Sequence, residues 1–393
     1  MITVIGLDGS PLSPLGLERL ARASLVMGGR RHLREVPVPP GTPTVALRDD
    51  PAEALRQVAE AGGDVVVLAS GDPGFFGVLR LLRERVAPDE LEVLPAVSSV
   101  ALAFARARLP WDDAVVVSAH GRDPRPAVAA CRAHPKVAVL TSDGAGPAEI
   151  GAALAGIDRR LCVVERVGLD GERVTWLTPA QASERTDWDP LNVVLVVDER
   201  RAVAPEKRWL AGATSPAGWA LPEDGFAHRD GMVTKAEVRA LVLARLGPRS
   251  GDLVWDVGAG SGSVAVECAR LGAAVVAVEK DDTSALEANV KAFDVDVQIV
   301  HGSAPQALAG LPAPDAVFVG GGGVAVVRAA VAQRPSRLVV ALATVERVAP
   351  VLAEMRDYAP EAVLVESSRL QPLGNGHRLV PMNPVFVVSG VLT

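Results

Sequence analysis

Apolar runs separated by polar and glycine-rich segments divide the first half of the chain into short strands and helices. Residues 2–7 and 64–69 are nearly continuous apolar runs, a pattern typical of strands that a sheet buries on both faces. Residues 14–23, 51–61 and 125–133 follow helical patterns. Because strands and helices alternate, we predict an α/β domain with a largely parallel sheet. Further strands are expected at 25–27, 91–94, 114–118, 136–140, 161–165 and 192–197.

The alternation stops at residues 199–231, which hold three prolines and no clear period, and then starts again. We therefore predict two domains, 1–205 and 228–393, joined by a linker over 206–227. The second domain is again α/β, with helices expected at 234–246, 262–271, 282–292, 324–333 and 345–357. Its strands are expected at 252–257, 274–279, 297–300, 314–319 and 337–342, followed by an antiparallel hairpin of 361–367 and 384–391.

Composition and charge limit the classes of molecule that the protein is expected to bind. The chain has 393 residues, which favours two domains, and a formal net charge of −7. Nucleic-acid binders are usually basic, and single-strand binders need aromatic platforms, whereas aromatic residues make up 4% here. The three cysteines are isolated, no signal peptide is apparent and no apolar stretch reaches membrane length. We therefore expect a cytoplasmic protein that handles small molecules, without a metal site, a nucleic-acid partner or a membrane partner.

A glycine-rich turn in the second domain carries the clearest chemical signal. Residues 254–262 read Val-Trp-Asp-Val-Gly-Ala-Gly-Ser-Gly, so a predicted strand runs into a turn with a helix behind it. Glycines let the backbone turn sharply and approach a ligand closely, and the N–H groups of a helix N-terminus can meet a polar group. Glu279 ends the next strand, 21 residues after Gly258. A carboxylate there can accept the ribose hydroxyl hydrogens of a nucleoside.

This pattern resembles motifs I and II of the class I S-adenosylmethionine-dependent methyltransferases. Residues 301–305 (His-Gly-Ser-Ala-Pro) stand where the third loop of that family flanks the adenine. The resemblance implies a Rossmann-like, doubly wound sheet, with S-adenosyl-L-methionine as cofactor and S-adenosyl-L-homocysteine as product. The cofactor-binding residues that it implies are Thr234, Gly258, Ala259, Gly260, Ser261, Gly262, Glu279, Gly302, Ser303 and Ala304.

Three further segments narrow this resemblance. Residues 231–239, 317–323 and 383–390 resemble the decarboxylating methyltransferases that act on carbon 15 of precorrin-type tetrapyrroles. Methyltransferases that act on base amines carry an Asn/Asp-Pro-Pro-aromatic motif where this chain has four glycines, so a base amine is not the expected substrate. Arg239 and Arg369 are further candidates for binding substrate carboxylates, although each is also read as a surface charge. The implied substrate-binding residues are Lys235, Gly320, Gly321, Gly322, His377 and Arg378.

The first domain resembles a second family, the tetrapyrrole (corrin/porphyrin) methylases. Residues 4–9, 68–77, 95–99 and 118–122 carry this resemblance. That family has an unrelated two-part α/β fold and holds the same cofactor in a cleft between its subdomains. The first loop, Gly-Leu-Asp-Gly, departs from the usual Gly-x-Gly-Pro-Gly and fits the branch that acts on carbon 5. The implied residues are Gly6, Gly71, Asp72, Pro73, Ser98 and Ser99 for the cofactor and Arg122 for the substrate.

Together the two resemblances cover nearly the whole chain. They imply methylation of a precorrin at carbons 5 and 15, with loss of the carbon-12 acetate carboxyl, in cobalamin biosynthesis. The expected partners are the precorrin substrate and further copies of the chain in a homo-oligomer, and no catalytic residue can be named. Two alternatives stay open: a nicotinamide-dependent oxidoreductase that uses residues 256–279, and a non-catalytic protein that senses S-adenosylmethionine.

Overall fold

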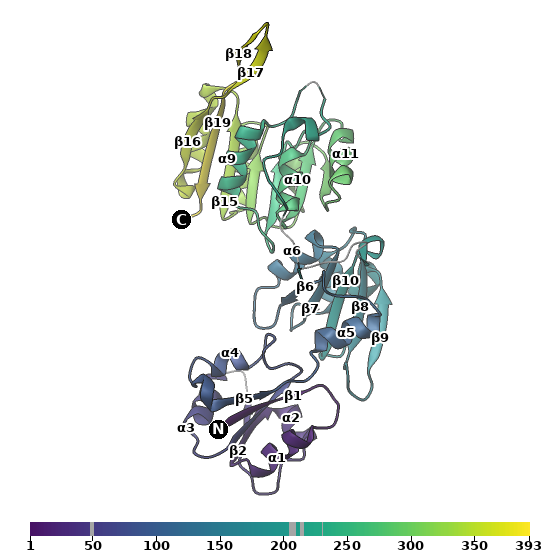
Figure 1. The fold of residues 1–393 in the computed structure, drawn as a ribbon. Helices are drawn as coiled ribbons and strands as arrows, with labels where there is room; N and C mark the ends of the chain where they lie inside the picture. Colours follow the sequence, from purple (N-terminus) through teal and green to yellow (C-terminus); the bar gives the residue numbers. More distant parts are fainter. Residues whose placement is uncertain (48–50, 204–209, 213–215, 230) are drawn as a thin grey trace. The chain divides into compact units, whose positions relative to one another are not determined.

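The structure is a computed structural model that describes residues 1–47, 51–203, 210–212, 216–229 and 231–393 (Figure 1). It forms two compact units, the first of Met1–Arg122 and Ala138–Lys207, the second of Asp123–Val137 and Arg208–Thr393. No helix among the described residues has both the length and the apolar character that a membrane crossing requires. The predicted domain limits stay a prediction, and residues 206–209 and 213–215 of the predicted linker lie outside the described residues.

The first unit begins with a five-stranded parallel sheet in the order β3-β2-β4-β1-β5. Val65 and Val67 of β4 pack with helix α3, while Val66 and Leu68 pack with helix α1 on the other face. Burial on both faces explains the continuous apolar run in the sequence. The strands are β1 (Ile2–Leu7), β2 (Leu25–Gly29), β3 (Thr44–Leu47), β4 (Val65–Ser70) and β5 (Leu91–Leu94), and the helices are α1 (Pro14–Arg22), α2 (Arg30–Glu35), α3 (Pro51–Glu60), α4 (Leu79–Leu82) and α5 (Ser99–Ala107).

The second sheet of this unit confirms the two-part fold, but it is not largely parallel as the sequence pattern predicted. Its order is β6-β7-β10-β8-β9, and β8 pairs antiparallel with both β9 and β10. Antiparallel neighbours need only a short turn, and Gly168 and Gly171 supply positive φ angles of 75° and 81° between β8 and β9. The elements between residues 115 and 197 are β6 (Val115–Ser118), α6 (Arg125–Ala133), β7 (Lys136–Leu140), α7 (Pro147–Ala153), β8 (Arg160–Glu165), β9 (Arg173–Leu177), α8 (Pro179–Glu184) and β10 (Asn192–Val197). Of these, α6 belongs to the second unit.

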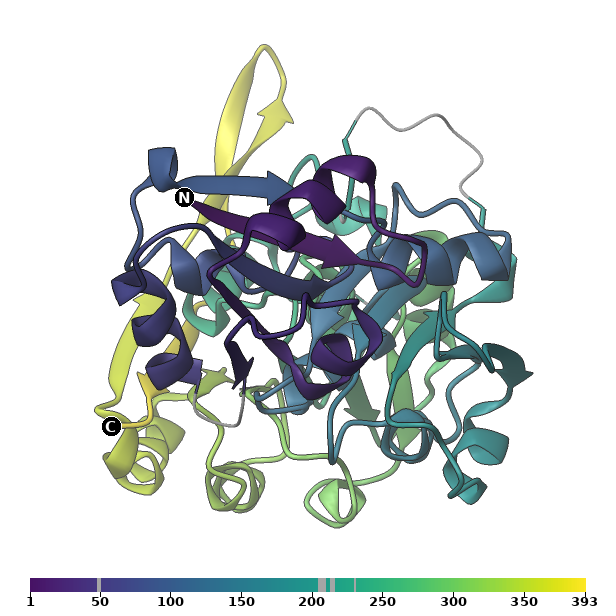
Figure 2. The same ribbon diagram turned by 90° about the horizontal axis from the view of Figure 1, so that it is seen from below.

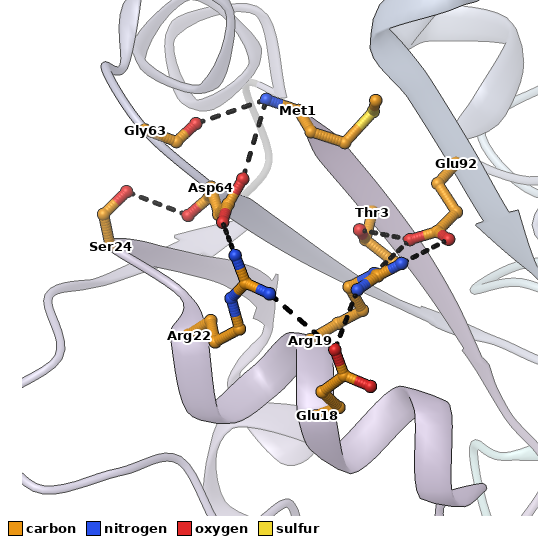
Figure 3. A network of polar contacts seen from close by, with 9 residues as sticks. All are labelled: Met1, Thr3, Glu18, Arg19, Arg22, Ser24, Gly63, Asp64 and Glu92. Atoms are coloured by element: carbon orange, nitrogen blue, oxygen red, sulfur yellow. Dashed lines mark hydrogen bonds and ion pairs between the residues drawn. The ribbon is translucent and has the colours of Figure 1, made fainter.

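A polar network fastens α1 to the first sheet (Figure 3). Arg19 on α1 donates from Nε and Nη2 to the two carboxylate oxygens of Glu92 on β5, at 2.6 and 3.0 Å. Thr3 on β1 donates to the same carboxylate at 2.9 Å. Thr3 and Glu92 lie near the amino ends of their strands, whereas ligands of α/β sheets bind at the carboxyl ends. The network is therefore structural.

The second unit contains a seven-stranded sheet in the order β13-β12-β11-β14-β15-β19-β16. Its first five strands are parallel, and β19 pairs antiparallel with β15 and β16. Helices α9, α10 and α11 cover one face (Figure 1), and α12 and α13 cover the other, which confirms the doubly wound α/β fold. The strands are β11 (Leu253–Val257), β12 (Ala274–Glu279), β13 (Gln298–His301), β14 (Ala316–Val319), β15 (Arg337–Leu342), β16 (Glu361–Val365) and β19 (Val385–Val391). The helices are α9 (Ala236–Leu246), α10 (Ser263–Arg270), α11 (Ser284–Ala292), α12 (Val324–Ala332) and α13 (Val348–Glu354).

The predicted antiparallel pairing at the end of the chain is confirmed, but a separate hairpin lies between its two strands. Strands β17 (Ser368–Leu373) and β18 (Gly376–Pro381) form a two-stranded sheet that projects beyond the seven-stranded one (Figures 1 and 2). Leu370 and Leu379 pair across this hairpin, and both are largely exposed.

Candidate functional site

The glycine-rich turn of the second unit has the backbone conformation that glycine permits. Gly258, Gly260 and Gly262 have φ angles of 75°, 56° and 72°. A Cβ on Gly258 would lie 3.0 Å from the backbone nitrogen of Gly321. The loop 258–262 therefore lies directly against the glycine-rich loop 320–323, at the carboxyl ends of β11 and β14. Two of the predicted motifs are thus brought together.

Glu279 is held by backbone N–H groups beside this turn. It is buried at the end of β12, and its Oε2 accepts a hydrogen bond from the N–H of Gly260 at 2.7 Å. Its Oε1 accepts from the N–H groups of Lys280 and Asp281, both at 2.9 Å. Each carboxylate oxygen can accept more than one hydrogen bond. Glu279 is therefore an oriented acceptor at the turn, and its role as a ribose ligand stays a prediction.

A cavity of about 520 Å³ opens at Glu279. A ligand pocket of this size suits a nucleoside-sized molecule. Three predicted cofactor residues line it, namely Gly260, Ser261 and Glu279, whereas Thr234, Gly258, Ala259, Gly262, Gly302, Ser303, Ala304, Lys235 and Gly320–Gly322 are not part of its lining. The other lining residues, which the sequence did not suggest, are Ala227, His228, Arg229, Met232, Asp281, Asp282, Ser284, Ala285 and Ala288.

The third predicted loop lies next to Glu279 without lining the cavity. The N–H of Gly302 donates to the backbone oxygen of Glu279 at 2.8 Å. Strand β13 pairs in parallel with β12, so that His301 stands opposite Glu279. The loop that begins at Gly302 is therefore bonded to the backbone of Glu279 and starts at the adjacent strand end.

Two arginines that were candidates for binding substrate carboxylates have acidic partners within the chain. Arg239 is completely buried and bonds through Nε to Glu267 at 3.0 Å. This ion pair is part of the core, so both interpretations of Arg239, as a substrate ligand and as a surface charge, are wrong. Arg369 donates to both carboxylate oxygens of Glu223, at 2.7 and 2.8 Å, and also to Glu237. These bonds lower the pKa of Glu223 to about 2 and occupy the Arg369 guanidinium.

The remaining candidates for substrate binding lie on separate elements. Lys235 immediately precedes helix α9. His377 and Arg378 are exposed on strand β18 of the projecting hairpin, away from the residues that line the cavity. The structure of the chain therefore does not gather these three side chains with Glu279 into one site.

A functional candidate that sequence reasoning missed is Asp256. It is almost fully buried on β11, directly before the glycine-rich turn. Its Oδ2 accepts from the N–H of Ala265 at 2.9 Å, while Oδ1 has no hydrogen-bond partner. Burial, together with the negative charge of Glu279, raises the pKa of this carboxyl to about 7. The signal in the sequence is a lone acidic residue inside an otherwise apolar strand.

Asp256 predicts a specific pH dependence of stability. Its pKa is higher in the folded chain than the ordinary 3.8, so the folded state binds the proton more tightly. The free energy of unfolding therefore falls as pH rises from about 4 to about 7 and levels off above that range. We expect Asp256→Asn to be more stable than the native chain at pH 8, with a smaller difference at pH 5. Urea unfolding of both proteins at the two pH values measures this, and a difference independent of pH would contradict it.

In the first unit, the predicted loops also come together. A Cβ on Gly6 would lie 2.2 Å from the backbone oxygen of Gly71 and 2.6 Å from the nitrogen of Ala96. Gly71 has a φ of 56°, and its Cβ would lie 3.3 Å from the nitrogen of Ser99. Ser98 is the N-cap of helix α5, and its hydroxyl oxygen accepts the N–H of Ala101 at 3.1 Å. The loops at the carboxyl ends of β1, β4 and β5 therefore converge.

Asp72 and Pro73 belong to the second of these loops, the one after β4, and the side chain of Asp72 bonds within that loop. Asp72 accepts the N–H of Gly74 at 2.8 Å, as in an ordinary Asx turn. Asp8 accepts the N–H of Val97 at 3.2 Å and thereby links the first and third loops. Arg122 belongs to the turn after β6, on the second sheet of the unit.

His32 is a second residue that the sequence did not single out. It is buried on α2, and its Nε2 lies 3.0 Å from the hydroxyl of Ser70, which precedes Gly71. Burial and the adjacent charge of Arg31 lower the pKa of His32 to about 4. The imidazole is therefore neutral at pH 7 and serves as a polar support for the end of β4.

Comparison with known proteins assigns each half. Residues 5–182 match the tetrapyrrole (corrin/porphyrin) methylases, and residues 224–391 match the precorrin methyltransferase domain. A Sinorhizobium protein named precorrin-6Y C(5,15)-methyltransferase [decarboxylating] is 37% identical in an alignment of 408 positions, which covers 98% of this chain and 94% of that protein.

Two proteins of Salmonella typhimurium match one half each. The cobalt-precorrin-7 C(5)-methyltransferase is 32% identical over 51% of this chain and 100% of its own length. The cobalt-precorrin-6B C(15)-methyltransferase (decarboxylating) is 35% identical over 40% of this chain and 88% of its own length. Since the Sinorhizobium protein matches nearly end to end, the chain belongs to the family of the decarboxylating precorrin-6Y C(5,15)-methyltransferases.

Proposed function

We propose that the chain methylates a precorrin at carbons 5 and 15 and removes the carboxyl group of the carbon-12 acetate, with S-adenosyl-L-methionine as the methyl donor. The observation that carries this proposal is the pairing of two family matches, one in each half, with a near end-to-end relative of the same two activities. Membership of this family replaces the alternatives of a nicotinamide-dependent oxidoreductase and a non-catalytic sensor.

The residues around the glycine-rich turn fit this cofactor. Glu279 presents a fixed carboxylate with one acceptor position left beside its three backbone hydrogen bonds, which suits a ribose hydroxyl group. Within the loop Gly258–Gly262, Gly260 has open space where a Cβ would point, which suits close approach of the methionine end to the backbone. Loop 302–304 is next to Glu279 and would flank the adenine, and Thr234 would complete the site. When bound, the cofactor supplies an electrophilic methyl group.

Methyl transfer to carbon depends more on the alignment of the substrate carbon with the methyl group than on general acid–base catalysis. A reduced tetrapyrrole is electron-rich at its meso carbons and acts as an enamine-like nucleophile. The chain's task is to hold that carbon in line with the methyl group and to exclude water. The loop Gly320–Gly322 supports this role, because it lies against the cofactor turn and Gly321 has open space where a Cβ would point.

Loss of the acetate carboxyl requires an electron sink, which the protonated macrocycle itself provides. No nucleophilic side chain is needed for this step. Lys235, His377 and Arg378 are proposed to bind the carboxylates of the substrate, because cations pair with them. Carbon-12 acetate and carbon 15 belong to the same part of the macrocycle, so one pocket can serve both reactions.

We assign carbon-5 methylation to the first unit. Gly6, Gly71, Asp72, Pro73, Ser98 and Ser99 are proposed to hold a second cofactor molecule, and Arg122 to bind a substrate carboxylate. The convergence of three loops at the carboxyl ends of parallel strands supports this assignment, because α/β sheets bind ligands there.

The two halves are predicted to work independently. Fragments 1–205 and 228–393, expressed separately, should each fold and bind S-adenosylmethionine, because each contains its own sheets and core. Calorimetric titration of each fragment measures this binding. Binding by one fragment alone would show that one of the two cofactor sites is wrongly assigned.

We also propose that the chain forms a homo-oligomer and works in the cytoplasm. The exposed leucines of hairpin β17–β18 support self-association, because exposed apolar surface on a small hairpin gains stability when covered. Sedimentation of the full chain measures its mass in solution. The three cysteines are buried and form no disulfide, which suits a reducing compartment.

Turnover tests the proposed function directly. The full chain is incubated with precorrin-6B and S-adenosylmethionine, and the product mass should show two added methyl groups and one lost carbon dioxide. A product with neither change would contradict the proposal.

A further inference from the structure

One buried side chain fastens the segment before helix α9 to the glycine-rich turn. Asn289 lies on α11 and is 1% exposed. Its Nδ2 donates to the backbone oxygens of Ala227 and Ser261, both at 2.8 Å. Its Oδ1 accepts from the N–H of Ala227 at 2.7 Å. A single amide therefore bridges two segments that are far apart in the sequence, using both of its donor hydrogens.

Both bridged residues line the cavity at Glu279. Ala227 belongs to the part of the lining that precedes α9, with His228, Arg229 and Met232. Ser261 belongs to the glycine-rich turn. The length of the bridge through Asn289 therefore sets the separation of these two parts of the lining.

Helix α11 also fixes the turn by packing. A Cβ on Gly262 would lie 2.0 Å from Cδ1 of Leu286, so the turn rests directly on this helix. Ala285 and Ala288 of the same helix line the cavity. A shift of Asn289 or Leu286 would consequently change the position of the turn that contains Gly260.

Other contacts hold the rest of the segment in place. Glu267 on α10 accepts the N–H groups of Ala220 and Leu221, at 3.0 and 2.7 Å. Phe226 packs on Phe293 with ring centroids 5.0 Å apart. Because these contacts do not depend on Asn289, a conservative change there should leave the segment attached to the unit while altering its position over the turn.

We propose that Asn289 is a positioning residue for carbon-15 methylation, which sets the width of the cofactor cavity by holding Ala227 against Ser261. This inference rests on the proposed function of the second unit. It adds to the implied cofactor ligands a residue that acts through the backbone of two others.

The test replaces Asn289 by Asp in the full chain. The new side chain has the same size and still accepts the Ala227 N–H, but it places an oxygen where the native amide donates to two carbonyl oxygens. We expect the KM for S-adenosylmethionine in carbon dioxide release to rise about tenfold, the loss of about 1.4 kcal/mol of binding. We expect kcat to change less than threefold, and carbon-5 methylation to keep its native KM.

A second variant and a matched control complete the design. Asn289→Ala removes all three hydrogen bonds without the repulsion and should raise the same KM in a folded protein. Asn192→Asp makes the same chemical change on β10 in the other unit, where Asn192 donates to Asp189, and should leave the KM of carbon dioxide release at its native value. Circular dichroism and melting temperature report the folding of each variant.

Binding is measured beside turnover so that two failures can be told apart. Titration of the full chain with S-adenosylhomocysteine should show two classes of site, one of them weakened about tenfold by Asn289→Asp. If the native chain binds but releases no carbon dioxide, the proposed function fails, and the titration still decides the role of Asn289. A lower melting temperature with native KM and native binding in both Asn289 variants would overturn the inference.

Discussion

Replacing Glu279 by alanine is expected to weaken cofactor binding at the second unit by tenfold or more. The carboxylate is buried, accepts three backbone N–H groups, including that of Gly260 at 2.7 Å, and lines the cavity with one acceptor position left. A hydrogen bond to a charged group contributes about 1.5–3 kcal/mol, and 1.4 kcal/mol corresponds to a factor of ten. The substitution also leaves the Gly260 N–H without its acceptor. The KM for S-adenosylmethionine in carbon dioxide release measures the effect.

Carbon-5 methylation in the same protein is the internal control, since it should keep its native KM. Glu287→Ala removes an acidic side chain from an exposed position of α11 that does not line the cavity, and should leave both reactions unchanged. A native KM for carbon dioxide release in Glu279→Ala would remove Glu279 from the proposed cofactor site.

A bulky side chain at Gly321 is expected to abolish decarboxylation and carbon-15 methylation together. Nothing lies within 4 Å of a Cβ at this position, and Gly321 does not have a positive φ, so leucine fits the backbone and fills the open space. Displacement of the substrate by about 1 Å costs about a hundredfold in rate, so both activities should fall at least that much. Labelled carbon dioxide release and product mass measure the two activities.

The neighbouring Gly322 is a poorer test, since it has a φ of 93° and its Cβ would lie 2.5 Å from Val326. Gly218→Leu is the matched control, because Gly218 also has open space and no positive φ. That variant should retain both activities. Loss of decarboxylation with full carbon-15 methylation in Gly321→Leu would show that the two reactions do not share this pocket.

The long elements could be predicted because burial on both faces leaves a strong pattern. Strand β4 and strands β11 and β12 are continuous apolar runs, and all three were predicted within a residue or two. Strands β3 and β9 were missed, because β3 has four residues and β9 is partly exposed along its length. The β17–β18 hairpin was also missed, since it has little buried surface to impose a pattern.

The candidate site likewise has residues that could be predicted from the sequence and residues that could not. The glycine-rich turn and Glu279 lie within a short stretch with a local strand–turn–helix–strand pattern, so they could be predicted from the sequence alone. Asn289 and the segment that begins at Ala227 act through contacts across 62 positions, which no local pattern records. Arg239 looked like an anion-binding side chain because its buried partner, Glu267, comes 28 positions later. The cofactor and substrate ligands, like the domain limits, stay predictions that the variants above test.

The most direct test of the proposed function follows the label from both reactants in one reaction. The full chain is given precorrin-6B labelled in the carbon-12 acetate carboxyl and S-adenosylmethionine labelled in its methyl group. The proposed function predicts a product with two labelled methyl groups, at carbons 5 and 15, and release of the carboxyl label as one carbon dioxide per molecule. A product that gains methyl groups while retaining the carboxyl label, or that gains none, would contradict it.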